Sequence, residues 1–176
     1  MRKIVKAMRK VIYLRDQSNF KRYINNLLEK VDFTPIVNIV PKEIKNITFV
    51  IPGMPAFSGG HTSILRLGTE LSKRGYDVGY VSFAPQNIDD MKKNAEINLA
   101  NYKGNILGDD IANVKSDVVI ATSWESVYYS RKISGYKMYF IQDYEPYFNL
   151  YGESYIMAKK SYEVGYHMVS LGKWNK

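Results

Sequence analysis

From Asn46 onward, short apolar runs alternate with segments of helical pattern, and no other feature of the sequence restricts the fold as strongly. The runs are continuous rather than alternating between apolar and polar residues, which is typical of strands whose two faces are both covered by helices. Each run is also too short to cross a membrane as a helix. We predict strands at residues 47–51, 78–83, 117–121, 137–141 and 167–170.

Helical patterns fill the intervals between these runs. The clearest helix spans residues 62–74, with an apolar face and Gly75 as its C-terminal stop. A short strand is predicted near Ile106, and further helices are predicted at residues 89–99, 124–133 and 153–164. Because repeated strand–helix–strand units specify a parallel sheet, we predict an α/β fold with a doubly wound, Rossmann-like sheet over residues 46–176.

The net charge of +8 is unevenly distributed along the chain. Residues 1–45 hold 11 Lys and Arg against 4 Asp and Glu, whereas residues 46–176 hold 14 against 13. The sequence therefore predicts a nearly neutral domain with a basic N-terminal extension. Since the domain has neither an excess of basic residues nor a nucleic-acid-binding motif, we expect no nucleic-acid partner.

The basic extension carries two amphipathic helical patterns. The first covers residues 3–15, and the second begins after Ser18 or Asn19 as N-cap. The apolar stripe of the second consists of Phe20, Tyr23, Ile24, Leu27, Leu28 and Val31. Such helices either pack on the main domain or lie on an anionic lipid surface. Pro35 and Pro41 predict an extended connector to the domain.

The composition excludes several kinds of chemistry. The chain has no cysteine, which excludes disulfides, thiolate metal ligands and a cysteine nucleophile. Its two histidines, His61 and His167, are far apart in sequence and suggest no metal site. The basic start lacks the apolar stretch of a signal peptide, so we expect a cytoplasmic location, with peripheral attachment to the inner face of the membrane as a further hypothesis.

Three loops follow predicted strands and have compositions suited to ligand contact. They are residues 52–61, 122–125 and 142–146. Ligands of doubly wound sheets bind at the carboxyl ends of the strands, where the strand order reverses. In the first loop, Gly59 and Gly60 permit positive φ angles and close approach of another group, and the amides of the following helix favour an anion. If the first strand is central, the first two loops face each other across one cleft.

The first loop matches neither of two common nucleotide-binding motifs. A dinucleotide fingerprint requires G-x-G-x-x-G and an acid at the end of the second strand. Here the glycines are Gly53, Gly59 and Gly60, and the second strand ends without an acid. A nucleoside-triphosphate loop requires Lys after its last glycine, whereas His61 occupies that position. With both motifs excluded, the first loop is described by the sequence only as a Gly-Gly turn at the start of a helix.

Side chains in these loops are candidates for contact with a ligand. His61 either binds a ligand or bonds the nearby backbone at the helix start. Trp124 forms either part of the core or a wall of the cleft. Asp143 and Glu145 either stabilise a turn or accept a proton from a substrate hydroxyl. Residues 128–166 contain 10 of the 15 tyrosines, which suits either a carbohydrate-binding surface or a packing interface.

Four sequence blocks, taken together, resemble a known family. The run ITFVIPGMPAFSGGHTSILRLGTELSKRGYDVGYVSF is similar to the start of the N-terminal, acceptor-binding domain of GT-B-fold glycosyltransferases of family 4. The blocks DVVIATSWESVYY, KMYFIQDYEPYF and YEVGYHMVSLGKW narrow the resemblance to bacterial rhamnosyltransferases that build cell-surface polysaccharides. The resemblance covers about residues 46–174 and leaves the basic extension unmatched.

The resemblance implies transfer of a sugar, with rhamnose suggested, from a nucleotide-sugar donor to a glycan or lipid-linked glycan acceptor, without a cofactor or metal. It places Gly59 and Gly60 near the donor phosphates and the acceptor. Asp143 is the candidate catalytic residue, which would activate or orient the acceptor hydroxyl. The acceptor side of the cleft would be lined by His61, Trp124, Gln142, Tyr144 and Glu145.

Enzymes of this family also need a C-terminal, donor-binding domain, and the matching blocks end close to Lys176. We therefore expect the chain by itself to lack transferase activity, whether it is a piece of a longer enzyme, a shortened reading frame or one half of a two-chain enzyme. The alternative hypothesis is a non-catalytic module that binds carbohydrate or a protein partner. A surface made for a second domain would also favour self-association of the chain.

Overall fold

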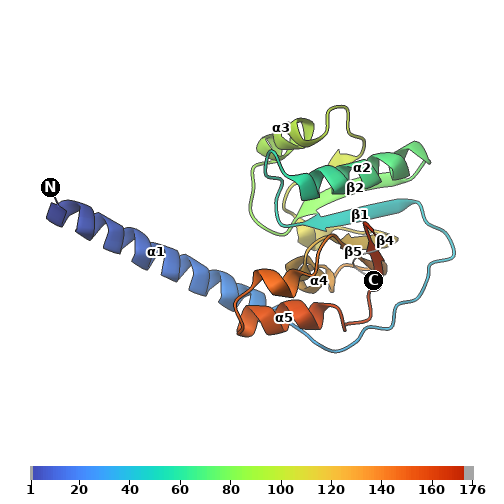
Figure 1. Ribbon diagram of the computed structural model, residues 1–176. Coiled ribbons are helices and arrows are strands. Elements are labelled where there is room, and N and C mark those ends of the chain that lie inside the picture. The colour runs from blue at the N-terminus through green and yellow to red at the C-terminus, as the bar shows by residue number, and fades with distance from the viewer. Residues whose placement is uncertain (1, 173–176) are drawn as a thin grey trace. The chain divides into compact units, whose positions relative to one another are not determined.

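The computed structural model describes residues 2–172, with side chains described from residue 12 onward. The chain divides into two units, Met1–Asp32 and Phe33–Lys176. Within the described residues, the first unit contains a long helix and the second contains a sheet with helices on it (Figure 1). Lys173 and Trp174, which belong to the last of the four resembling blocks, lie outside the described residues.

The N-terminal unit forms one continuous α-helix, α1 (Arg2–Leu28). The prediction of two helices with a break at Ser18 or Asn19 is therefore wrong. Neither residue stops a helix, because each disfavours helix by no more than about 0.7 kcal/mol relative to Ala, and no Gly or Pro occurs within α1. Val31, which was predicted on the second helix, lies beyond its end. Within the described residues, no helix is long and apolar enough to cross a membrane.

The second unit begins with a connector and continues into a six-stranded sheet. Residues 33–45 have no regular secondary structure, as Pro35 and Pro41 predicted. The strands then follow as β1 (Asn46–Ile51), β2 (Asp77–Ser82), β3 (Asn105–Ile106), β4 (Val118–Ala121), β5 (Tyr136–Ile141) and β6 (His167–Ser170). Their order is β3-β2-β1-β4-β5-β6, and every pairing is parallel. The predicted α/β, doubly wound fold is confirmed.

Helices cover both faces of the sheet. They are α2 (Gly59–Lys73), α3 (Ile88–Asn98), α4 (Trp124–Ser130) and α5 (Glu153–Ser161), with 3-10 turns η1 (Ile111–Asn113) and η2 (Glu145–Phe148). In Figure 1, α2 and α3 lie on one side of the sheet, and α4 and α5 on the other. Phe49 of β1 packs in one cluster with Ile64 of α2, whereas Val50 packs with Ile133 on the opposite face. This division explains the continuous apolar runs, since successive strand residues point to opposite faces.

All the predicted strands are present, and the helices of the second unit differ from prediction only at their ends. Helix α2 begins at Gly59, earlier than predicted. Helix α4 ends at Ser130 instead of Ile133, and α5 ends at Ser161 instead of Val164. Ile133 and Val164 are both buried in core clusters. Their apolar character therefore reflects packing of the turns that follow the helices, and periodicity alone could not separate the two cases.

The strand order reverses beside β1, because β2 and β4 pair with its two sides. The chain passes from β1 to α2 on one face and from β4 to α4 on the other face. The two connecting loops therefore diverge at the carboxyl edge of the sheet, which is the topological switch point at which such folds bind ligands. This arrangement places the first two predicted loops at the same edge of the sheet.

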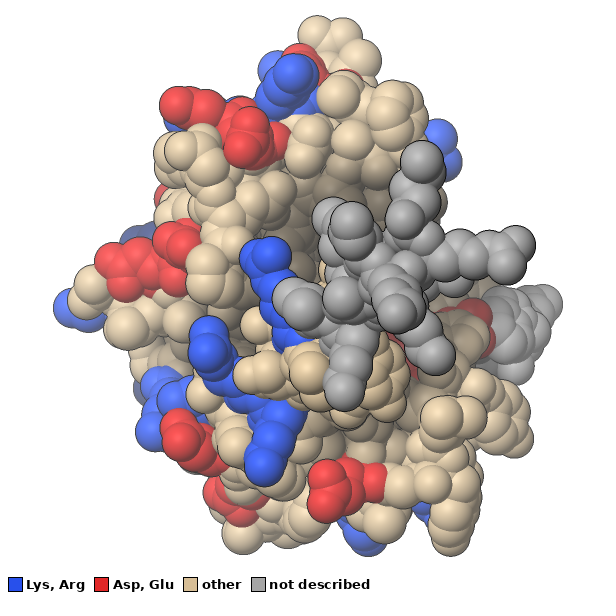
Figure 2. All heavy atoms as spheres, turned by 90° about the vertical axis from the view of Figure 1, so that its left-hand side faces the viewer, with Lys and Arg blue, Asp and Glu red and all other residues tan. Residues whose placement is uncertain are grey.

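Basic and acidic side chains are interspersed on the face of the molecule shown in Figure 2. Uncharged side chains separate them over much of this face. Residues 46–176, with 14 basic against 13 acidic side chains, match this pattern.

Candidate functional site

The β1–α2 loop, residues 52–58, is held in place by polar side chains from the segment around α3. The Gln86 side chain bonds both backbone groups of Met54: its Oε1 accepts from the N–H at 2.6 Å, and its Nε2 donates to the carbonyl at 3.1 Å. Asn98 donates to the Pro55 carbonyl at 2.7 Å and accepts from the Ser58 N–H at 2.8 Å. These four hydrogen bonds hold the backbone of the loop in one conformation. Gln86 and Asn98 could not be predicted from the sequence, because an isolated amide side chain belongs to no recognisable motif.

The tip of this loop exposes an aromatic side chain. Phe57 has φ 56° and is 89% exposed. A non-glycine residue with positive φ is strained and is common at functional sites. Gly53 has φ +112°, and a Cβ there would lie 3.2 Å from Oε1 of Gln86. The positive φ angles of this loop thus occur at Gly53 and Phe57.

Gly59 and Gly60 do not use the positive φ that glycine permits. They are the first two residues of α2 and have no positive φ. The reason is that Ser58 caps the helix at this point, its hydroxyl accepting from the His61 N–H. A Cβ on Gly60 would lie 3.2 Å from Oε1 of Gln142, so the Gln142 side chain packs directly against Gly60. Two predicted site residues from different loops are therefore neighbours.

His61 is buried, and both of its ring nitrogens are engaged within the loop. Nε2 lies 2.8 Å from the Gly53 carbonyl oxygen, and Nδ1 lies 2.8 Å from Oγ of Ser58. A carbonyl only accepts, so Nε2 carries the proton and Nδ1 accepts from the serine hydroxyl. Burial lowers the pKa of His61, partly opposed by the bond to Gly53. His61 therefore bonds the nearby backbone at the start of α2, which was one of its two predicted roles; the other was ligand binding.

The β4–α4 turn is built by hydroxyl groups. The Ser123 hydroxyl accepts from the Ser126 N–H, and the Ser126 hydroxyl accepts from the Thr122 and Ser123 N–H groups at 2.8 and 2.9 Å. The Thr122 hydroxyl donates to the Val50 carbonyl at 2.8 Å and ties the turn to β1. Trp124, the first residue of α4, is buried and stacks edge-on against Tyr128. Its ring is thus part of the core.

Glu145 connects this turn with the loop after β5. Its Oε2 accepts a hydrogen bond from the Trp124 N–H at 2.6 Å. Burial raises the pKa of the Glu145 carboxyl to about 7, the Trp124 N–H opposes this shift, and the charges of Glu125 and Asp143 add to it. A partly buried carboxyl group that titrates near neutrality at the carboxyl edge of the sheet is the strongest chemical feature of this region.

Tyr162, which follows α5, fixes the backbone of the 143–145 segment. Its hydroxyl donates to the Asp143 carbonyl at 3.0 Å and accepts from the Glu145 N–H at 3.2 Å. Asp143 uses Oδ1 to accept from the Tyr144 N–H at 2.8 Å. The Tyr144 ring contacts the rings of Tyr147 and Tyr162, with centroid distances of 4.8 and 5.4 Å. The Asp143 carboxylate thus has a turn-stabilising contact, one of its two predicted roles.

The structure brings most of the predicted residues together at one edge. Gln142 contacts Gly60, and Glu145 bonds the backbone of Trp124, so the loop after β5 touches both other loops. Exposed apolar side chains continue this edge along the chain; they are Tyr147, Phe148, Leu150 and Tyr151. Within the described residues, no group of three His, Asp or Glu side chains is arranged to hold a metal ion. The arrangement can accept a proton at Glu145 and offer aromatic surface to a ligand.

The comparisons with known proteins leave the family of the chain open. No protein-family model matches the sequence, and no curated protein matches it.

Proposed function

We propose that this chain is the acceptor-binding domain of a nucleotide-sugar-dependent glycosyltransferase, acting on a glycan or a lipid-linked glycan in the synthesis of a surface polysaccharide. The single observation that carries the proposal is the position of Glu145, a carboxyl group with a pKa of about 7 at the switch point of a doubly wound sheet. The sequence blocks that resemble family 4 enzymes, rhamnosyltransferases among them, supply the reaction class. The nucleotide sugar is the donor substrate, and its binding belongs to a further domain.

Glu145 is the proposed general base that takes the proton of the acceptor hydroxyl. Such a base is most effective when its pKa lies near the working pH, because it is then ionised yet still basic. The hydrogen bond from the Trp124 N–H fixes one carboxylate oxygen and hence the direction of the group. Asp143, bonded to the Tyr144 N–H, is assigned to orienting the acceptor and to holding the pKa of Glu145 high.

The aromatic residues of this edge are the proposed surface for sugar rings. Sugar rings pack their apolar C–H faces on aromatic side chains, and Phe57, Tyr147 and Tyr151 are exposed. A lipid-linked acceptor lies at a membrane surface, where the basic composition of residues 1–45 would support peripheral attachment. Deletion of residues 1–33 is then expected to abolish co-sedimentation with anionic vesicles, and unchanged co-sedimentation would contradict this attachment.

Sugar binding to the chain of 176 residues tests the proposal directly. The probes are glucose, galactose, N-acetylglucosamine, rhamnose and their methyl glycosides, and the readout is the amide spectrum of the ¹⁵N-labelled protein. We expect at least one probe to shift the amides of Gly60, Trp124 and Glu145 in a saturable manner. A panel that shifts none of these amides, or shifts only amides elsewhere, refutes the proposal.

Glu145→Gln separates a catalytic site from a simple binding site. The amide retains an oxygen for the Trp124 N–H, so the variant keeps the shape of the loop and removes the titrating group. For a general base, we expect the pH dependence of the sugar-induced shifts near pH 7 to disappear in Glu145→Gln and to persist in the control Glu153→Gln, an exposed acid at the start of α5. Binding with no pH dependence in any variant would favour the non-catalytic module, which the exposed aromatic residues also support.

A further inference from the structure

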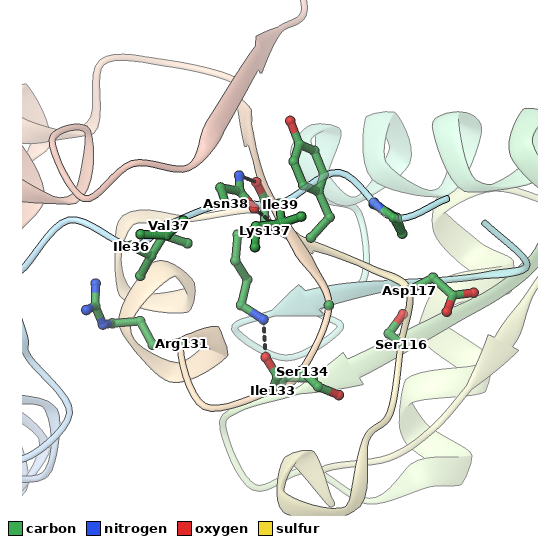
Figure 3. Close-up of a pocket in the computed structure, with 13 residues that line it drawn as sticks. Ile36, Val37, Asn38, Ile39, Ser116, Asp117, Arg131, Ile133, Ser134 and Lys137 are labelled. Carbon is green, nitrogen blue, oxygen red and sulfur yellow. Dashed lines mark hydrogen bonds between the residues drawn. The ribbon is translucent and has the colours of Figure 1, made fainter. Parts of the chain in front are cut away.

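A cavity lies at the opposite edge of the sheet from the candidate site. Its volume is about 590 Å³, and its walls come from the connector, from the segment before β4 and from the segment between α4 and β5 (Figure 3). Ser116 and Asp117 precede β4, while Ser134 precedes β5. The cavity is therefore at the amino ends of β4 and β5. No residue of the candidate site lines it.

The connector forms a fixed wall of this cavity. The Ile36 N–H donates to the Val164 carbonyl at 3.0 Å. The side chain of Asn38 pairs with the backbone of Lys137, accepting from its N–H at 2.8 Å and donating to its carbonyl at 2.7 Å. These bonds attach the connector to β5 and to the segment before β6. The cavity is thus built by ordered contacts within one unit.

Lys137 is the unusual residue of this cavity. Lys137 belongs to β5 and is only 4% exposed, and its Nζ donates a hydrogen bond to the Ile133 carbonyl. Figure 3 shows the side chain reaching down between the Arg131 side of the cavity and the Ser116 side. Among the described residues, no carboxylate forms an ion pair with it. An ammonium group has three donors, and one carbonyl satisfies only one of them.

The acid that lines the cavity does not neutralise Lys137. Asp117 turns its carboxylate toward the start of β1, where Oδ2 accepts from the N–H groups of Lys45 and Asn46 at 2.8 and 3.0 Å. Figure 3 shows this carboxylate pointing away from the lysine. A second cation, Arg131, lines the other side and donates to the Thr34 carbonyl at 2.9 Å. The cavity therefore combines two cations with an acid that is directed elsewhere.

We propose that this cavity binds a small anion through its carboxylate or phosphate oxygens, with Lys137 as the charged partner. A buried ammonium without a counter-charge is unfavourable, and an anion within hydrogen-bond distance would remove that cost. The guanidinium of Arg131 adds positive potential, and the Ser134 hydroxyl at the rim adds a hydrogen-bonding group. Burial lowers the pKa of Lys137 to about 8, and a bound anion would raise this pKa.

Anion binding is tested on the full chain at pH 7 with inorganic phosphate and with acetate, at constant ionic strength adjusted with sodium chloride. We expect a saturable rise in melting temperature with at least one of these ions, and shifts in the amides of Ser134 and Lys137. A response to phosphate that exceeds the response to acetate assigns a phosphate ligand, and the reverse assigns a carboxylate. If neither ion gives a saturable response, the proposal is overturned.

Two variants and one control assign the response to the cavity. Lys137→Met keeps the volume of the side chain and removes its charge, so we expect at least a tenfold loss of affinity. Arg131→Met is expected to weaken anion binding by a smaller factor. Its affinity is measured in place of that of Lys137→Met if Lys137→Met does not fold. Lys132→Met, at an exposed lysine of the same loop, should bind as the unaltered chain does. Retention of full affinity by a folded Lys137→Met, or by Arg131→Met in its place, would show that the ion binds elsewhere.

Discussion

Each edge of the sheet holds an ionisable side chain whose pKa is shifted by burial, Glu145 at one edge and Lys137 at the other, and the two shifts are in opposite directions. At the carboxyl edge, Glu145 accepts from the backbone N–H of Trp124, and burial raises its pKa to about 7. At the amino edge, Lys137 donates to the backbone carbonyl of Ile133, and burial lowers its pKa to about 8. Desolvation favours the neutral form of both groups. The same physical cause therefore raises the pKa of the carboxyl group at one edge and lowers the pKa of the amine at the other.

The two edges also differ in how their backbones are fixed. Side chains fix the carboxyl edge, where Gln86 and Asn98 hold the β1–α2 loop and Tyr162 holds the loop after β5. At the amino edge, side-chain bonds of Asn38 and Asp117 are joined by a close approach of backbone, where Gly135 lies against the Ser116 carbonyl. Gly59 at the carboxyl edge therefore has room for a new methyl group, whereas Gly135 at the amino edge has none.

Gly135→Ala gives the largest expected effect. Gly135 has φ +110°, and a Cβ there would lie 2.1 Å from the Ser116 carbonyl oxygen, so the backbone must move. We expect a loss of about 4 kcal/mol in the free energy of unfolding or failure to fold, measured by urea denaturation. Gly59→Ala at the carboxyl edge, where a Cβ meets nothing within 4 Å, should be neutral or stabilising by up to about 1 kcal/mol. Equal effects at the two glycines would refute the contrast between the edges.

Glu145→Gln gives the second largest expected effect, which is a change in how the free energy of unfolding depends on pH. The pKa of Glu145 is raised from 4.5 to about 7 in the folded chain, so the folded state keeps its proton while the unfolded state loses it. Stability therefore falls as pH rises from about 4.5 to 7, by about 3 kcal/mol from this group. Urea denaturation across this range should show the fall in the unaltered chain and in Glu153→Gln, and its absence in Glu145→Gln. Identical pH profiles for all three would contradict the assigned shift.

Lys137→Met gives the smallest of the three effects. The contribution of Lys137 to stability changes with pH in the direction opposite to that of Glu145. The pKa of Lys137 is lowered from 10.5 to about 8, so the unfolded chain holds the proton longer than the folded chain does. Lys137 therefore lowers stability below pH 8, and this cost is relieved as pH rises from 8 to 10.5. After allowance for solvent screening, we expect Lys137→Met to be more stable by about 1 to 2 kcal/mol at pH 7 in phosphate-free buffer. A gain that does not diminish by pH 10.5 would point to packing rather than charge.

Much of the fold could be predicted because its signals are local. The apolar runs, Gly75 and the prolines of the connector each act within a few residues of chain, and the strands they predict are present. The break predicted near Ser18 was wrong, because a weak local preference against helix does not end one. The helix ends at Ser130 and Ser161 were missed, because apolar residues that pack after a helix resemble its last turn.

The candidate site was predictable as a set of loops but not as a set of roles. Parallel topology alone brings the loops after β1, β4 and β5 to one edge. It does not show that His61 serves the loop backbone, or that Glu145 rather than Asp143 carries the raised pKa. Gln86 and Tyr162 were missed because their partners are backbone groups distant in sequence, and such pairings leave no pattern along the chain.

By itself, the sequence determined the alternation of strands and helices, the parallel sheet, and the separation of a basic extension from a nearly neutral domain. These follow from periodicity and composition, which are properties of neighbouring residues. Only the tertiary structure decided which ionisable groups are buried, because burial depends on what the rest of the chain places around them. Glu145 and Lys137 are ordinary charged residues in the printed sequence, and desolvation at two opposite edges of one sheet makes them the chemically distinctive ones.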